Sequence, residues 1–141
     1  MGSFKPNKIL DVVRGCFVAA TPEEIVRQSL LLEMIRTLGY PKELLAVEKQ
    51  LSELPHLMGV ERLPKRRTDI VCYARGIHPL LLIECKEGDV GKEAIQQALG
   101  YNAFVGAPFV AVAGKRGCAL VFPESKSFLP HYKELLLSAN Y

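Results

Sequence analysis

The sequence lacks the cysteine and histidine patterns that hold structural zinc or build a hydrolase triad. Its four cysteines are spread over 141 residues with no Cys-x-x-Cys pair and no paired Cys/His spacing, which argues against zinc. We predict four reduced thiols, two of them small core residues. The three histidines, His56, His78 and His131, share no spacing, so the sequence shows no histidine-based nucleophile system.

Long apolar runs and nucleotide-binding loops are also missing. No stretch approaches the roughly 20 apolar residues that span a bilayer, and the N-terminus has no apolar signal-peptide core. Neither a Walker phosphate loop nor a Gly-x-Gly-x-x-Gly turn occurs. We therefore expect a cytoplasmic protein with no membrane partner and no nucleotide cofactor.

The composition is that of a folded domain with a small positive surplus. Hydrophobic residues make up 49% and charged residues 23% of the chain, which argues against disorder. The formal charge is +3 at pH 7, and such a surplus favours nucleic acid only where basic residues cluster. Two clusters occur, Lys65-Arg66-Arg67 and Lys115-Arg116. Basic runs are usually solvated loops, so these are candidate DNA contacts only in combination with a catalytic motif.

Start and stop signals predict an α-β-β-β-α-β-β-α order of elements. Thr-Pro-Glu-Glu at residues 21–24 is typical of a helix start, and Gly39 before Pro41 marks the end of that helix. Residues 41–45 suit either a helical turn or the start of a strand, and residues 55–64 read as a loop. The predicted helices cover residues 21–38, 90–105 and 129–137, and the predicted strands cover residues 44–51, 67–73, 80–86, 109–113 and 119–122.

These elements predict an α/β fold with a mixed central sheet of about five strands flanked by helices. The strand, helix, strand passage over residues 80–113 implies a parallel crossover, whereas the earlier strands read as an antiparallel meander. We expect one domain over residues 1–141. Its predicted parts are an N-terminal arm (1–20), a core (21–125) and a C-terminal helix (126–141).

Two predicted strands carry charge where apolar residues are the rule. Glu84 and Lys86 share one face by the period of two, and the apolar run at residues 79–83 implies a strand in the middle of the sheet. A short turn would fold the strand of Asp69 back beside them, so the three groups can converge. Buried charges need partners or a cation. Two carboxylates around one magnesium ion, with a lysine beside an attacking water, perform metal-dependent phosphodiester cleavage.

Helix residues near these strands have structural as well as functional explanations. Glu23 and Glu24 ordinarily cap a helix, although either could reach a metal-bound water. Gln97 and Tyr101 lie four apart on one helix face, and such faces are often half-exposed rims. Because this helix directly follows the strand of Glu84, Gln97 could instead lie beside the metal or a phosphate.

Five motifs, taken in order, resemble those of one known family. The chain is similar to the N-terminal nuclease domain of type I restriction enzyme R subunits, in the PD-(D/E)XK nuclease superfamily, over about residues 17–122. The resemblance implies a restriction-endonuclease-like core and hydrolysis of DNA phosphodiester bonds. The motifs are Thr21–Gln28, Gly39–Lys42, Arg67–Val71, Ile83–Lys86 and Gln97–Asn102.

The resemblance also implies roles for the strand residues. Asp69 and Glu84 would bind Mg²⁺ or Mn²⁺ together with the main-chain carbonyl of Cys85, and Lys86 would orient or polarise the attacking water. The chain departs from its relatives at Ala113–Lys115, where they tend to carry Thr-Asn-Gly, so a polar contact near the site is expected to be missing.

The helix motifs and the partners follow from the same resemblance. Gln97 and Tyr101 match the Gln-x-x-x-Tyr motif that supports the site and the DNA backbone, and Glu23 or Glu24 matches the acid of the first helix. The ATP-driven motor of R subunits is absent from this sequence, which implies partner subunits, self-association or a weak nuclease with little sequence preference. The alternatives are a non-catalytic nucleic-acid-binding or assembly module and a structural domain in which Glu84 forms a buried ion pair with Lys86.

Overall fold

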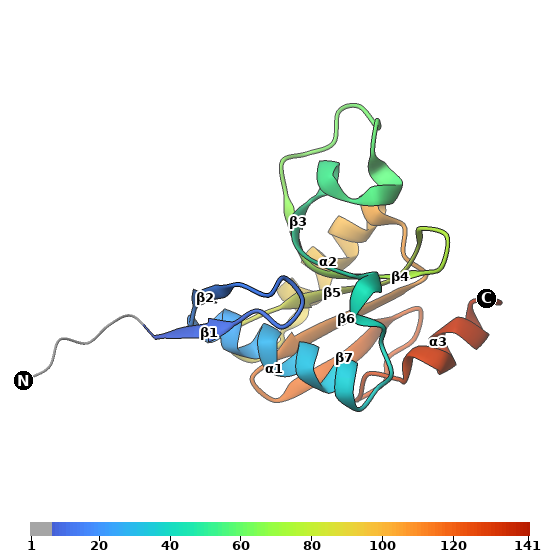
Figure 1. The fold of residues 1–141 in the computed structure, drawn as a ribbon. Coiled ribbons are helices and arrows are strands. Elements are labelled where there is room, and N and C mark those ends of the chain that lie inside the picture. The colour runs from blue at the N-terminus through green and yellow to red at the C-terminus, as the bar shows by residue number, and fades with distance from the viewer. Residues whose placement is uncertain (1–6) are drawn as a thin grey trace, which may run out of the picture.

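A central sheet carries the candidate residues, and helices cover both of its faces (Figure 1). The computed structural model describes residues 7–141. The strands of this sheet are β3 (Leu45–Gln50), β4 (Arg67–Ala74), β5 (His78–Cys85), β6 (Phe109–Gly114) and β7 (Gly117–Phe122). The helices around it are α1 (Pro22–Arg36), α2 (Lys92–Val105) and α3 (Tyr132–Ser138). None of the described helices is long and apolar enough to cross a membrane.

The order of the strands places β5 in the middle of the sheet. The order is β3-β4-β5-β6-β7, and every neighbouring pair is antiparallel except β5 and β6. Helix α2 is the crossover between these two parallel strands. The predicted α/β class, the mixed sheet of five strands and the central position of β5 are therefore confirmed.

Residues of β4 alternate between apolar cores on opposite faces of the sheet. Ile70 and Cys72 belong to the larger core, which includes buried leucines of α1 and α3. Val71 and Tyr73 belong to a core on the other face, next to the C-terminal end of α2. The fold therefore has three layers, with α1 and α3 on one face of the sheet and α2 on the other.

Helix α1 begins where its sequence signals predict. The hydroxyl of Thr21 accepts a hydrogen bond from the backbone N–H of Glu24 at 3.2 Å, and Pro22 is the first helical residue, as expected for a capped start. The helix ends at Arg36, slightly before the predicted end. Gly39 has a φ of +75°, and this left-handed conformation turns the chain toward β3.

The N-terminal arm contains a β-hairpin that was not predicted. Strands β1 (Lys8–Leu10) and β2 (Phe17–Ala19) pair antiparallel. The buried carboxylate of Asp11 accepts hydrogen bonds from two backbone N–H groups of the turn, and Val12 N–H donates to the side chain of Gln28 on α1 at 2.9 Å. The hairpin is thus attached to α1. Residues 1–6 of the expected arm lie outside the described residues.

Residues 51–66, here called the finger, rise from the sheet between β3 and β4 (Figure 1). This segment contains two short 3₁₀ turns, η2 (Leu51–Glu53) and η3 (Pro55–Leu57), and only η3 lies within the loop predicted over residues 55–64. His56 in η3 lies 2.7 Å from the Tyr73 hydroxyl through Nδ1 and 2.7 Å from the Val105 carbonyl through Nε2. Because a carbonyl can only accept, Nε2 donates to Val105. The base of the finger is therefore fixed to both β4 and α2.

Candidate active site

Asp69 and Glu84 are neighbours across the β4–β5 pair. Ile70 pairs with Ile83 in this antiparallel pair. Asp69 precedes Ile70 and Glu84 follows Ile83, so the two acids lie opposite each other. The backbone N–H of Asp69 donates to Glu84 Oε2 at 3.0 Å, and the backbone N–H of Cys85 donates to Asp69 Oδ2 at 2.8 Å. Both acids are buried, with 8% of Asp69 and 5% of Glu84 exposed. The structure thus brings together the two carboxylates that the sequence placed on adjoining strands.

Burial of these acids disfavours their charged forms. Desolvation raises the pKa of Glu84 to about 8, and the negative charge of Asp69 adds to this rise. Desolvation also raises the pKa of Asp69 to about 6, although the Cys85 N–H and the Arg27 guanidinium act to lower it. The two carboxylates therefore lack enough neighbouring positive charge to stabilise their ionised forms. A bound divalent cation would supply that charge.

Arg27 contacts this pair and was not among the predicted site residues. Its Nη1 lies 2.5 Å from Asp69 Oδ1 and 2.6 Å from Glu48 Oε1 on β3, and its Nε and Nη2 donate to Glu24 at 2.9 and 2.6 Å. The sequence could have indicated its role, because position 27 shares a helix face with Leu31 and Met34, which are buried. A charged residue on an apolar helix face needs buried partners.

Glu23 and Glu24 face different surroundings. Glu24 is buried, and both of its carboxylate oxygens accept hydrogen bonds, from Arg27 and Gln28. Glu23 is exposed and borders a cavity that Lys86 also lines. Of the two acids, Glu23 is therefore the one beside Lys86.

Lys86 pairs with Gln97 rather than with Glu84. Lys86 Nζ donates to Gln97 Oε1 at 2.7 Å, and within residues 7–141 no ion pair joins Lys86 to an acid. Tyr101 lies one turn after Gln97 on α2. The guanidinium of Arg66, at the foot of the finger, lies 5.5 Å from the centre of the Tyr101 ring. Gln97 and Tyr101 thus form a polar row on α2, with Lys86 at one end and Arg66 at the other.

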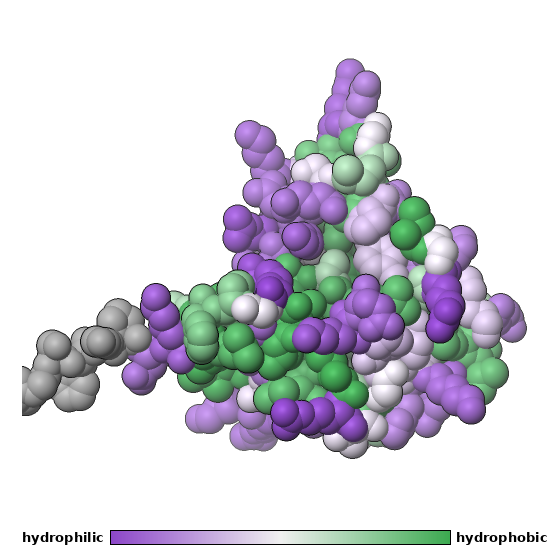
Figure 2. Space-filling model, in the orientation of Figure 1, coloured by the Kyte–Doolittle hydropathy of each residue, from purple (hydrophilic) through white to green (hydrophobic). Residues whose placement is uncertain are grey.

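The predicted basic contacts fall into two groups on opposite edges of the sheet. Lys65, Arg66 and Arg67 are exposed at the foot of the finger, where β4 begins beside the edge strand β3. Lys115 and Arg116 occupy the β6–β7 turn at the other edge, and Arg116 lies 3.4 Å from Asp89. In Figure 2, hydrophilic side chains gather along the finger and apolar ones over α1 and the N-terminal hairpin. The group at the foot of the finger is the larger of the two, with three basic residues against two in the turn.

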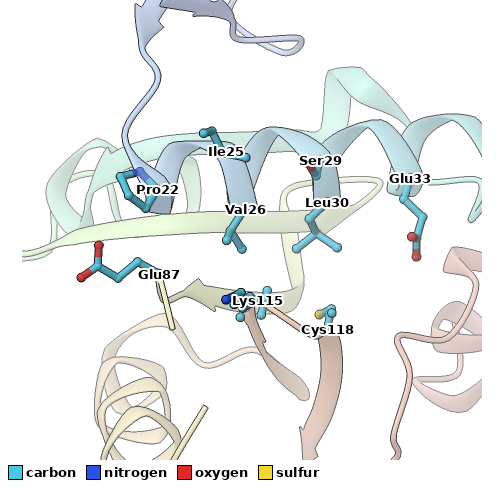
Figure 3. A pocket seen from close by; sticks show the side chains of 12 residues that line it. Pro22, Ile25, Val26, Ser29, Leu30, Glu33, Glu87, Lys115 and Cys118 are labelled. Atoms are coloured by element: carbon cyan, nitrogen blue, oxygen red, sulfur yellow. The ribbon is translucent and has the colours of Figure 1, made fainter. Parts of the chain in front are cut away.

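A cavity of about 580 Å³ separates α1 from the β6–β7 turn (Figure 3). Its walls are mainly apolar, with Val26 and Leu30 facing Cys118. A Cβ atom on Gly114 would lie 2.6 Å from the Gly88 carbonyl, so this close approach requires glycine. Ala113, the position at which the sequence led us to expect a missing polar contact, pairs with Cys85 and lines the same cavity.

The donor atoms of the site suit a hard divalent cation. Magnesium prefers oxygen ligands and is commonly held by one or two carboxylates together with water. No group of three or more His, Cys, Asp or Glu side chains in residues 7–141 is arranged to hold a metal. Asp69 and Glu84 would therefore need main-chain and water oxygens beside them. The backbone N–H of Cys85 contacts Asp69, so the Cys85 backbone lies next to the acid pair.

The fold and the paired acids define an α/β protein whose mixed sheet is consistent with a restriction-endonuclease-like core. Residues 22–127 match the family described as Type I restriction enzyme R protein N terminus. The chain belongs to this family and is thus related to type I restriction enzymes. The matched range contains all the site residues predicted from the sequence. No curated protein and no solved structure shows a significant match.

The raised pKa values of the acid pair predict how stability depends on pH in the absence of metal. Between the ordinary glutamate value of 4.5 and about 8, the folded chain binds more protons at this pair than the unfolded chain. The stabilisation is complete below the ordinary value and is lost as the pH rises through the folded values. The free energy of unfolding in EDTA should therefore fall between about pH 5 and about pH 8.5.

Urea denaturation across this pH range measures the effect. The Glu84→Gln variant is the control, because an amide cannot ionise and its profile should be flatter. A parent profile that is level or rises over the range would contradict the prediction.

Proposed function

We propose that the chain is a divalent-metal-dependent DNA endonuclease domain of the PD-(D/E)XK type. The observation that carries the proposal is the contact between buried Asp69 and Glu84, with Lys86 two residues further along the same segment. Membership of the type I restriction R protein family supports it. Neighbouring carboxylates with a lysine at the rim suit hydrolysis of a phosphodiester better than they suit a purely structural role.

In this proposal the residues divide the work by position. Asp69, Glu84 and the Cys85 carbonyl would hold Mg²⁺ or Mn²⁺, which supplies Lewis acidity when bound. Lys86, held by Gln97, orients the attacking water at the rim of the site. Glu23 lies beside the same rim and accepts a hydrogen bond from that water.

The DNA partner would follow the polar row of α2. Phosphates on one side of the acids would contact the basic residues at the foot of the finger, Lys65, Arg66 and Arg67. Tyr101 would contact the DNA backbone between these residues and Gln97. Lys115 and Arg116 would meet the backbone at the opposite edge of the sheet. Partner subunits or a second copy of the chain would supply a further cutting centre.

Incubation of the chain with plasmid DNA and with single-stranded DNA tests the proposal. Cleavage of either substrate in Mn²⁺, and none in EDTA, supports a metal-dependent nuclease. Intact DNA under all conditions, with Mn²⁺ binding absent by calorimetry, contradicts it.

A second candidate is a binding or assembly module that keeps the fold without the chemistry. One observation favours it: Arg27 already provides a positive charge at Asp69. The apolar Ala113, at a position where the resemblance implies a polar residue, agrees with it. DNA retention without divalent metal and without cleavage would identify this function.

Under both functions, the finger should dominate the electrostatic part of DNA binding. The Arg66→Ala/Arg67→Ala double variant should weaken binding and reduce the slope of log affinity against log salt by roughly 1 to 2, because each phosphate contact releases counterions. Fluorescence anisotropy over a salt series measures this slope. The Lys133→Ala variant on α3 is the control, and equal slopes for all three proteins would exclude the finger as a phosphate-binding surface.

A further inference from the structure

Arg27 is the only buried cation in contact with the candidate site among the described residues. Just 4% of the residue is exposed, and its nitrogens reach three carboxylates, those of Glu24, Glu48 and Asp69. A guanidinium cannot lose its proton in a protein. A permanent positive charge is therefore fixed beside Asp69.

The carboxylates around this guanidinium outnumber the buried cations. Arg27 contacts three acids, and Glu84 adds a fourth through its contact with the Asp69 backbone N–H. Arg67 also approaches Glu48, at 3.3 Å, but 62% of its side chain is exposed, and an exposed pair contributes little. Arg27 is thus the main charge that keeps these acids together when no metal is bound.

The backbone of Glu48 is strained in a way that supports this network. Glu48 has a φ of +57°, which is uncommon for a residue with a side chain. The β3–β4 ladder contains the pairs Val47–Ile70 and Lys49–Thr68 but omits the pair between Glu48 and Asp69. Regular β pairing is therefore interrupted at the residue whose carboxylate contacts Arg27. Backbone strain of this kind often marks a functional site.

We propose that Arg27 is a positioning residue that acts as the resident counter-cation of Asp69, holding the acids together before a divalent ion binds and then competing with that ion. The inference rests on the proposed function, because it requires a metal at Asp69 and Glu84. Arg27 occupies Asp69 Oδ1, while Oδ2 faces the Cys85 N–H. An incoming metal must share Asp69 with the guanidinium, and the two positive charges repel each other.

The Arg27→Gln variant separates this role from simple packing, because the two effects of the change have opposite signs. Loss of the buried charge leaves the acids uncompensated, so the melting temperature in EDTA should fall by roughly 10 °C. Loss of the repulsion should raise the Mn²⁺ affinity by roughly 10- to 100-fold. Thermal unfolding and calorimetric titration with Mn²⁺ measure the two effects. A purely structural arginine would lower both stability and affinity.

Two further variants complete the test. Arg27→Lys keeps the charge but not the forked geometry, so it should lose stability while keeping the Mn²⁺ affinity close to that of the parent. Arg36→Gln, in the exposed last turn of α1, should change neither quantity. If Arg27→Gln does not fold, Glu24→Gln is measured instead. It frees Arg27 to move toward Asp69 and should weaken Mn²⁺ binding several-fold.

The outcomes distinguish this inference from the proposed function. If the parent binds Mn²⁺ and Arg27→Gln binds it equally or less tightly, the role of Arg27 is overturned and the nuclease proposal stands. An unchanged Mn²⁺ affinity in Glu24→Gln also overturns the role. If neither the parent nor any variant binds Mn²⁺, both proposals are overturned together.

Discussion

Replacement of Lys86 by alanine is expected to reduce DNA cleavage by about 10²- to 10⁴-fold, the usual contribution of a group that transfers or orients a proton. Binding of Mn²⁺ should remain close to that of the parent. The reason is the partner of Lys86, which is Gln97 at 2.7 Å, while Asp69 and Glu84 are held by backbone N–H groups and by Arg27. Removal of the lysine therefore leaves the acid pair intact.

Cleavage of plasmid DNA in Mn²⁺ and calorimetric titration with Mn²⁺ provide the two measurements. The Lys92→Ala variant, exposed in the first turn of α2, is the matched control for the loss of one positive charge near the site. Equal cleavage by the parent and Lys86→Ala would remove the lysine from the mechanism. Loss of Mn²⁺ binding in Lys86→Ala would instead make it a structural partner of the metal site.

The strands of the candidate site could be predicted because their pattern is local. Residues 79–83 are apolar on both faces, which indicates a central strand, and the short turn after Ala74 makes β4 and β5 an antiparallel pair. The exact register was not predictable, because a one-residue shift between Cys72 and Tyr73 sets Asp69 opposite Glu84. The period of the second helix also placed Gln97 near the same strand, and its contact with Lys86 agrees with that placement.

The arginine network could not be predicted because it joins three separate elements. Arg27 lies on α1, Glu48 on β3 and Asp69 on β4, and no spacing along the chain encodes their meeting. The positive φ of Glu48 is equally invisible in a sequence that reads as a regular strand. The buried position of Arg27 on an apolar helix face was the one local indication.

Two irregular segments were missed or only partly predicted because side chains organise them. The N-terminal hairpin depends on Asp11, whose carboxylate satisfies backbone N–H groups in the turn. The finger depends on His56, which contacts Tyr73 and Val105 from a segment with no regular period. In both cases a buried polar side chain replaces the periodic hydrogen bonds that make helices and strands predictable.

Replacement of Asp69 by alanine should abolish Mn²⁺ binding, and DNA cleavage with it. The site has two buried carboxylates and no third acidic side chain in position among the described residues, so the loss of one removes half of its charged ligands. The substitution also removes an acceptor of the Cys85 N–H and so releases the backbone that would offer its carbonyl. Lys86→Ala and Asp69→Ala should therefore differ: the first keeps the metal and the second does not.

The fold of Asp69→Ala should persist, because Arg27 keeps Glu24 and Glu48 as partners. Circular dichroism and thermal unfolding in EDTA test this, and calorimetric titration with Mn²⁺ tests the loss of binding. The Asp89→Ala variant, whose carboxylate is 72% exposed, is the matched control and should bind Mn²⁺ like the parent. If folded Asp69→Ala still bound Mn²⁺ with the affinity of the parent, the ion would occupy another position, and the acid pair of β4 and β5 would be a structural feature held by Arg27 alone.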